Sequence, residues 1–389
     1  MPLSSPESPA HDSRPRAGRL RSKIRLTARI LAALFLATLV AAGLTEGFAR
    51  LRFLPSIGSV LEHEPYKKLI LRQAPRGVAG PTTFTTNRWG MRGGEPPRDW
   101  SRWDTWIAIG SSTTVCYHLD DRKTWPYLLQ GLLQQGNPRT WIGNAGQDGV
   151  TSRAESYFME KVVSRVQPDA VLYMAGVSDL ALSFSDDRRE NSSPYDRAFE
   201  KRIDREMDKR SVRERSRLYR AYKLRQRRQA SAPVTVDQAA NPSRFPAPLA
   251  APEDSINADS LLAKPLEAFS RNILRIQALS RKMDIRVLFM THPYLYGTDS
   301  SWAGRESRTL EYRQRDYRIS AATERRLLDR FNEELLGLCA ANRLECLDLA
   351  PLIPNDSLHF YDEGHFTEQG AALAAEKIAA YILVQAAKE

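Results

Sequence analysis

Cysteine and histidine are scarce in this chain of 389 residues, which has three cysteines and six histidines. The cysteines Cys116, Cys339 and Cys346 form no Cys-x-x-Cys pair and no Cys/His spacing typical of a metal site. The sequence therefore gives no reason to expect a metal ion. Two arrangements stay open for the thiols: an oxidising compartment could join Cys339 to Cys346, or all three could be buried and reduced.

Positive charge is plentiful but unevenly spread, and the formal net charge is +11. Residues 1–29 hold seven Lys or Arg and two acidic residues, and residues 186–228 hold sixteen Lys or Arg and nine acidic residues. A nucleic-acid-binding domain usually concentrates its basic residues on the folded surface that contacts the phosphates. Because the excess lies in a terminal segment and one internal segment, we expect no nucleic-acid partner.

An uncharged run near the N-terminus, Ile30–Thr45, predicts a membrane segment. The run reaches the length of about 20 residues that a span needs if Arg29 and Glu46 lie near the membrane interfaces. We therefore predict a transmembrane anchor at residues 26–48. Residues 1–25 are rich in Ser, Pro and Arg and are expected to form a disordered basic tail.

The flanking charges predict how this anchor is oriented. Seven Lys or Arg precede the apolar run and fewer follow it, which places the N-terminus in the cytoplasm and the rest in the periplasm or cell exterior. A cleaved signal peptide is the alternative, with a small-residue cleavage site at Ala41-Ala42-Gly43. The anchor is favoured because the apolar run is at the long end for a signal peptide.

Short apolar runs alternate with helical stretches in the rest of the chain. Buried strands are predicted at Trp106–Gly110, Trp141–Asn144, Ala170–Ala175, Arg286–Thr291 and Leu344–Leu349. Helices are predicted at about 123–135, 152–166, 262–283, 319–342 and 368–386. This alternation predicts a three-layer α/β/α fold with a parallel five-stranded sheet and helices on both faces.

One interval, residues 183–261, interrupts this rhythm within a domain predicted to span residues 53–389. Its first half is charged and compatible with helix, and its second half, Ala230–Ser255, is rich in Ala and Pro and is predicted to be irregular. We interpret the interval as an insertion at the domain edge. It is either a solvated helix and loop, or a lid or docking element for an anionic partner such as phospholipid head groups or an acidic polysaccharide.

Polar residues follow three of the predicted strands, where an open α/β sheet binds its ligands. These segments are Gly110-Ser111-Ser112-Thr113-Thr114, Asn144–Ser152 and Gly176-Val177-Ser178-Asp179. The first could simply cap a helix, or it could present a hydroxyl at a helix N-terminus, where backbone amides stabilise an oxyanion. It is not the Gly-x-Ser-x-Gly elbow of the α/β-hydrolases.

A serine nucleophile needs a base, and the base needs an acidic group that fixes its tautomer. Asp362 and His365 lie in one loop after the last predicted strand and can supply both groups. We take His365 as the histidine with such a carboxylate in that loop, and we assign no role to His359. His118 is predicted to lie on a helix face, and His292 either lines the pocket or stacks on a tyrosine.

These segments resemble the four blocks of the SGNH/GDSL hydrolase superfamily, named for Ser, Gly, Asn and His. The resemblance of the first block implies that Ser112 is the nucleophile. That of the second implies that Gly149 is the glycine of the oxyanion hole. The resemblance of the last block implies that Asp362 is the acidic group and His365 the base. A further segment, Asn87–Gly93, resembles the lead-in of membrane-anchored members.

The third block departs from the family pattern, because Ser178 stands where Gly-x-Asn-Asp has its asparagine. In the family, the side-chain amide of that asparagine donates to the oxyanion. Losing one such donor costs roughly 3–4 kcal/mol in the transition state. We expect Ser178 to be a weaker donor, acting directly or through a water.

The resemblance implies a flavodoxin-like SGNH fold and a serine esterase without a cofactor. Location outside the membrane favours an O-acetyl or other acyl ester on an envelope or exported polysaccharide, or on a lipid. Two alternatives stay open: an O-acetyltransferase that uses the same residues, and a non-catalytic polysaccharide-binding scaffold with this fold.

Overall fold

The computed structural model describes residues 16–52, 60–61, 63–183, 193–207, 216–237, 258–295, 307–312 and 315–388. The chain divides into two compact units. The N-terminal unit comprises Met1–Phe53 with Ser216–Leu218, and the large unit comprises Leu54–Arg215 with Tyr219–Glu389.

A single long helix, α1 (Arg16–Arg52), forms most of the N-terminal unit. Its segment Lys23–Phe48 is long and apolar enough to cross a membrane, and its apolar side chains are exposed to solvent. A signal sequence would have the same properties. The helix begins ten residues earlier than the predicted anchor, so residues 16–25 are helical and not the disordered tail that was expected; residues 1–15 lie outside the described residues.

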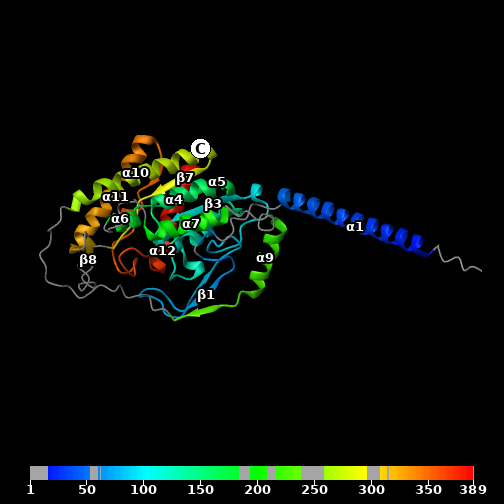
Figure 1. The fold of residues 1–389 in the computed structure, drawn as a ribbon. Helices are drawn as coiled ribbons and strands as arrows, with labels where there is room; N and C mark the ends of the chain where they lie inside the picture. The colour runs from blue at the N-terminus through cyan, green and yellow to red at the C-terminus, as the bar shows by residue number, and fades with distance from the viewer. Residues whose placement is uncertain are drawn as a thin grey trace, which may run out of the picture. The chain divides into compact units, whose positions relative to one another are not determined.

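A parallel five-stranded sheet forms the centre of the large unit (Figure 1). Its strands are β3 (Asp104–Gly110), β4 (Thr140–Asn144), β5 (Ala170–Met174), β7 (Arg286–Met290) and β10 (Glu345–Leu347). They lie in the order β10-β7-β5-β3-β4, and every neighbouring pair is parallel. This is the flavodoxin-like strand order, and all five strands were predicted from the sequence.

Helices cover both faces of this sheet, as predicted. The bounds of those that pack on it are α3 (Trp125–Leu133), α4 (Ser152–Phe158), α6 (Val177–Ser183), α7 (Pro194–Met207), α10 (Ala258–Met283), α11 (Ala321–Asn342) and α12 (Glu368–Ala386). A π-helical turn (Met159–Val163) and α5 (Ser164–Val166) continue α4. Short 3-10 turns lie at Trp100–Arg102, Asp121–Lys123 and Ala350–Leu352.

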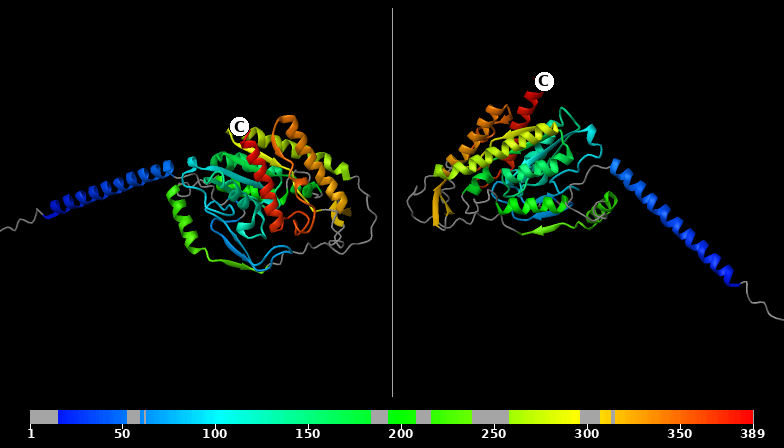
Figure 2. Two further views of the ribbon diagram at one scale, coloured as in Figure 1. Left: turned by 180° about the vertical axis from the view of Figure 1, so that it is seen from behind. Right: turned by 45° about the horizontal axis from the view of Figure 1, so that its top comes forward.

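The alternation of side chains along β3 shows how the two faces are divided. Ile107 and Ile109 belong to a core shared with α4, α7, α10 and α11. Trp106 and Ala108 belong to the opposite core, shared with α3 and α12. Seen from behind, α12 in red crosses the sheet on the second face (Figure 2). The central strands are buried on both sides, which explains their continuous apolar sequences.

Two smaller sheets were not predicted. Strands β1 (Lys68–Leu71) and β2 (Thr82–Thr85) form an antiparallel pair, and β6 (Val234–Val236) joins β1 in parallel. Strands β8 (Ser307–Tyr312) and β9 (Arg315–Ser320) form a hairpin, so α11 begins at Ala321 and not at 319. Strands β1, β2 and β6 are only partly buried, so they lack the continuous buried apolar runs by which the central strands were predicted.

The insertion is partly integrated into the core, in contrast to a solvated helix and loop. Phe199 on α7 stacks on Phe158 of α4 with ring centroids 5.6 Å apart, and Ile203 is fully buried. The second helix, α9 (Arg217–Ala230), buries none of its residues. Strand β6 lies within the stretch predicted to be irregular, and residues 238–255 of that stretch lie outside the described residues.

A disulfide joins Cys339, near the end of α11, to Cys346 on β10, while Cys116 is a free, buried thiol. Of the two arrangements left open by the sequence, the oxidised one is present.

Candidate active site

The predicted nucleophile lies at the point where the sheet reverses its strand order. Strand β3 has β4 on one side and β5 on the other, so a crevice forms beyond its carboxyl end. Gly110 ends β3 with a φ of +141°, and a Cβ there would lie 2.4 Å from the Thr114 hydroxyl oxygen. This tight turn leads directly into α2 (Ser112–Val115), which Ser112 begins.

The three residues predicted as a triad form a continuous hydrogen-bonded chain. His365 Nε2 lies 2.8 Å from Ser112 Oγ. His365 Nδ1 lies 2.8 Å from both carboxylate oxygens of Asp362. The same carboxylate accepts hydrogen bonds from the backbone N–H groups of Gly364 and His365, at 3.0 and 2.8 Å. Asp362 thus holds both the ring and the backbone of the loop.

A tight hairpin presents His365. Phe360 and Phe366 form an antiparallel bridge, and Tyr361 N–H donates to the His365 carbonyl at 3.0 Å. The Tyr361 ring stacks on the His365 ring, with centroids 5.5 Å apart and an interplanar angle of 9°. The ring of His365 is therefore held on its face by Tyr361 and at Nδ1 by Asp362.

Asp362 and His365 shift each other's pKa in opposite directions. Burial alone would lower the pKa of His365, but the Asp362 carboxylate outweighs it and holds that pKa above its ordinary value. Burial alone would raise the pKa of Asp362, but His365 and the two backbone donors hold it below its ordinary value. Asp362 is therefore placed to stabilise the imidazolium that forms when neutral His365 receives the proton of a serine.

A second hydrogen-bonded chain joins the nucleophile helix to the His365 loop. The Thr113 hydroxyl donates to the Gly364 carbonyl at 3.0 Å, and so it accepts from His292 Nε2, which lies 3.0 Å away. His292 is 1% exposed, and burial lowers its pKa to about 3. Its ring lies edge-on to Tyr294, so it supports the loop and does not stack face to face on that tyrosine.

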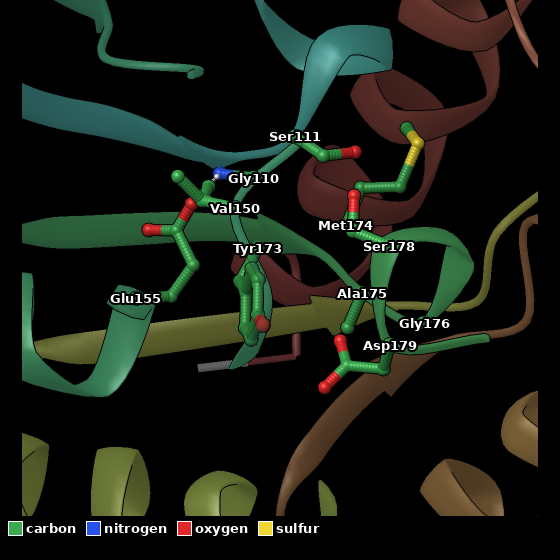
Figure 3. A pocket seen from close by; sticks show the side chains of 10 residues that line it. All are labelled: Gly110, Ser111, Val150, Glu155, Tyr173, Met174, Ala175, Gly176, Ser178 and Asp179. Carbon is green, nitrogen blue, oxygen red and sulfur yellow. Dashed lines mark hydrogen bonds between the residues drawn. The ribbon is translucent and has the colours of Figure 1, made fainter. Parts of the chain in front are cut away.

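The residues predicted for the oxyanion hole lie at the ends of β3, β4 and β5. Gly149 has a φ of +67°, and Ser178 lies in the first turn of α6. A cavity of about 10 Å³, room for about one water, is lined by Gly110, Ser111, Ser178 and Asp179, among others (Figure 3).

Two buried carboxyl groups hold this side of the site together. Glu155 accepts from Gly110 N–H at 3.0 Å, and burial raises its pKa well above the ordinary value. Asp179 accepts from the Ser152 N–H and hydroxyl, at 3.1 and 2.5 Å. Burial raises the pKa of Asp179 to about 7. Asp179 therefore joins the second block to the third, in addition to any role in capping its own helix.

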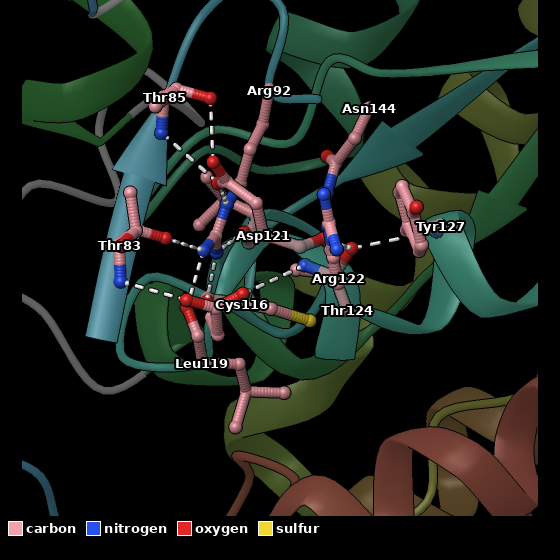
Figure 4. Close-up of polar contacts among 12 residues, drawn as sticks. Thr83, Thr85, Arg92, Cys116, Leu119, Asp121, Arg122, Thr124, Tyr127 and Asn144 are labelled. Carbon is pink, nitrogen blue, oxygen red and sulfur yellow. Dashed lines mark hydrogen bonds and ion pairs between the residues drawn. The ribbon is translucent and has the colours of Figure 1, made fainter. Parts of the chain in front are cut away.

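Arg92 binds the segment that follows the nucleophile helix (Figure 4). Its buried guanidinium donates to the carbonyls of Val115, Cys116 and Leu119 and pairs with Asp121 at 3.0 Å. The backbone of Arg92 also bridges to Asn144 of β4. The resemblance of Asn87–Gly93 to the family drew attention to this segment, but no sequence pattern indicates what the arginine contacts.

Two other histidines differ from what their sequence context indicated. His118 lies in the turn after α2 and not on a helix face, with its ring edge-on to Tyr361 at 5.9 Å. His359 has a carboxylate of its own, because its Nδ1 lies 2.6 Å from Asp356 Oδ1. His365 is thus not the one histidine of this loop with an acidic partner.

Within the described part of the chain, no group of three or more His, Cys, Asp or Glu side chains is placed to hold a metal ion. The site consists of a hydroxyl, an imidazole, carboxyl groups and backbone amides.

Two of the solved structures to which this chain is similar come from bacteria. A protein assigned to the lipolytic G-D-S-L family from Desulfitobacterium hafniense shares 13% sequence identity over 71% of this chain and 98% of that chain, with a TM-score of 0.38. A catalytic mutant of an acetylxylan esterase from Geobacillus stearothermophilus shares 12% identity over 71% of this chain and 92% of that chain, with a TM-score of 0.39. No curated protein matches the chain by sequence.

The family model of the GDSL-like lipase/acylhydrolase family matches residues 108–373, which is more than half of the chain. The match begins within β3, before the nucleophile turn, and ends in α12, beyond the His365 loop. The chain therefore belongs to the GDSL-like lipase/acylhydrolase family and is a carboxylic ester hydrolase.

Proposed function

We propose that this protein is a serine esterase in which Ser112 is the nucleophile, His365 the general base and Asp362 the group that orients it. The observation that carries the proposal is the chain of 2.8 Å contacts from Asp362 through His365 to Ser112. Nucleophile and base within hydrogen-bond reach, with the base oriented by a third group, is the geometry that activates a serine.

The reaction proceeds in two steps. His365 Nε2 takes the Ser112 proton as Oγ attacks the ester carbonyl, and the alcohol then leaves with that proton. Water next loses a proton to His365 and attacks the acyl-enzyme, which releases the acid and restores Ser112. Asp362 remains ionised throughout and stabilises the imidazolium that forms in each step.

The oxyanion of each step is proposed to form against the backbone N–H groups of Ser112 and Gly149, with Ser178 as a weaker third donor. Ser178 lines a cavity with room for about one water, whose other lining residues include Gly110 and Ser111 of the turn before the nucleophile. A water held there can pass on a hydrogen bond that the shorter side chain does not reach.

An acetyl ester is the proposed substrate group, carried by an envelope or exported polysaccharide or by a lipid. The domain is proposed to act in the periplasm or at the cell exterior, held by α1 as a membrane anchor. The disulfide between Cys339 and Cys346 supports that compartment, since such bonds persist where conditions are oxidising.

Labelling with a fluorophosphonate tests the nucleophile. The full chain in detergent is treated with the probe, and peptide mass spectrometry locates the label. We expect labelling on Ser112 that is lost in Ser112→Ala and His365→Ala. Ser111→Ala is the matched control, because it removes the neighbouring hydroxyl and should leave labelling intact. A folded protein that takes up no label would contradict the proposal and favour the non-catalytic scaffold.

Hydrolysis and acetyl transfer are separated by their products. With an acetylated donor and an added polysaccharide, hydrolysis releases free acetate whether or not the acceptor is present. Acetylated polysaccharide formed faster than free acetate would instead assign the transferase activity.

A further inference from the structure

The start of α7 contacts the predicted oxyanion glycine directly. A Cβ added to Gly149 would lie 2.7–3.1 Å from three ring atoms of Tyr195, so the tyrosine ring covers the Cα of this residue. The Ser193 hydroxyl donates to the Gly149 carbonyl at 3.2 Å. Two sides of Gly149 are therefore occupied by residues of the insertion.

The position of Tyr195 is fixed by its neighbours. The buried Asp196 carboxylate accepts from the Thr151 N–H at 2.8 Å and from the Thr151 hydroxyl at 2.9 Å. It also accepts from the Ser193 N–H at 2.7 Å, which closes the turn at the start of α7. The ring is thus mounted on a buried hydrogen-bonded turn, as a preorganised binding residue would be.

The ring nevertheless remains open to solvent. Tyr195 is 60% exposed, although aromatic side chains gain most when they are buried. The further exposed positions on α7 are Pro194, Ala198, Lys201, Asp204 and Arg205, of which Pro194 and Ala198 are apolar and the others charged. The exposed face of α7 therefore offers one aromatic ring beside two apolar and three charged residues, whereas a long acyl chain would need a longer continuous apolar path.

We propose that Tyr195 is a stacking platform for a pyranose ring that carries the scissile ester; this inference rests on the proposed esterase function. A pyranose has a face of C–H groups that packs on an aromatic ring and a rim of hydroxyls that suits charged neighbours. Because the ring lies against Gly149, a sugar stacked on it would hold its ester beside the proposed oxyanion hole. Tyr195 is then a specificity-determining residue supplied by the insertion.

Two esters of the same acid test the platform: methyl tri-O-acetyl-β-D-xylopyranoside, which has the sugar ring, and ethyl acetate, which lacks it. With the full chain in detergent, Tyr195→Ala should raise KM for the pyranoside about tenfold and leave ethyl acetate hydrolysis unchanged. Tyr195→Phe keeps the ring and should retain the wild-type KM. Tyr127→Ala, which removes an exposed tyrosine of α3, is the matched control.

The outcomes distinguish failure of the platform from failure of the esterase. Equal loss on both esters would show that the ring only supports Gly149, and no change on either would overturn the platform. Ethyl octanoate is assayed as a third ester. A loss of activity in Tyr195→Ala that is confined to this ester would overturn the platform and assign the ring to binding an acyl chain. Calorimetric binding of the same pyranoside to Ser112→Ala separates the two proposals. If the wild type hydrolyses neither ester, binding that Tyr195→Ala abolishes supports the platform, and absent binding overturns it.

Discussion

Two turns of the same sequence pattern, Asp-x-x-His, lie six residues apart in the loop before α12. In each, the aspartate accepts from the backbone N–H of its histidine, at 3.1 Å for Asp356 and 2.8 Å for Asp362. In each, a carboxylate oxygen also lies within 2.8 Å of the histidine Nδ1. Only the second histidine reaches a serine, because His365 Nε2 lies 2.8 Å from Ser112 Oγ.

The difference arises from where each turn lies in the hairpin. His359 is at its base, where its carbonyl accepts from Thr367 N–H at 2.9 Å at the start of α12. His365 lies beyond the Phe360–Phe366 bridge, at the end that faces α2. The Asp356 side chain is 44% exposed and that of Asp362 is 25% exposed. The same local pattern therefore anchors a helix in one place and presents a base in the other.

The largest expected effect is on kcat, which should respond differently to the same substitution in each of the two turns. Asp362→Asn removes the carboxylate that orients His365 and stabilises its charged form, so we expect kcat to fall about 10⁴-fold. Asp356→Asn is the matched control and should change kcat by no more than about twofold, because its histidine touches no reacting group. Steady-state acetate release measures both, and similar losses in the two variants would contradict the assignment.

The next prediction concerns His292, a buried histidine with no carboxylate beside it among the described residues, and the way it makes the protein's stability depend on pH. Burial lowers the pKa of His292 to about 3, so the folded protein keeps this ring neutral while the unfolded chain binds a proton below about pH 6.5. The stability that this ring contributes is full above pH 6.5 and is lost as the pH falls, by about 1.4 kcal/mol per pH unit.

Urea unfolding at pH 7 and pH 5 measures this loss. The His292→Phe variant should lose ~2 kcal/mol less between the two pH values than the wild type does. Comparing the change with pH removes the constant cost of losing the contact with Thr113. The same pH dependence in both proteins would show that His292 is protonated in the folded state or accessible to water.

The smallest expected effect is on kcat and concerns Ser178, which replaces the family asparagine in the proposed oxyanion hole. Ser178→Asn restores a longer donor, so we expect kcat to rise about tenfold, less than the full value of a lost donor. Ser178→Ala should lower kcat, since it removes the remaining hydroxyl. If both variants keep the wild-type rate, the backbone amides alone stabilise the oxyanion. Residue 178 then makes no contribution to catalysis.

The sheet could be predicted from sequence because its strands are buried on both faces. Runs such as Trp106–Gly110 and Ala170–Ala175 have no polar interruption, and each was placed within a few residues of its observed bounds. The order of these strands followed from the family resemblance, and the residues Ser112, Asp362 and His365 followed from the blocks after them. Their catalytic roles remain predictions.

The contacts that connect distant segments could not be predicted. Arg92 donates to backbone carbonyls at and after the end of α2, and His292 hydrogen-bonds to Thr113. The partners are far apart in the sequence, so no local sequence pattern predicts these contacts. The Asp356–His359 turn was missed for a related reason, since the Asp-x-x-His pattern fits His359 as well as His365. Only the three-dimensional path of the hairpin separates them. Tyr195 lay in a segment whose composition indicated a solvated helix, and packing of Phe199 overrode that composition.

The Arg92 contacts bear on how a soluble version of this enzyme should be cut. The family match covers residues 108–373, so a fragment trimmed to it would leave the carbonyls of Val115, Cys116 and Leu119 without their cationic donor. It would also remove most of α12, which closes one face of the sheet. A fragment that starts ahead of β1 and runs through α12 keeps the whole folding unit, and it is the sensible starting point for crystallisation and enzyme assays.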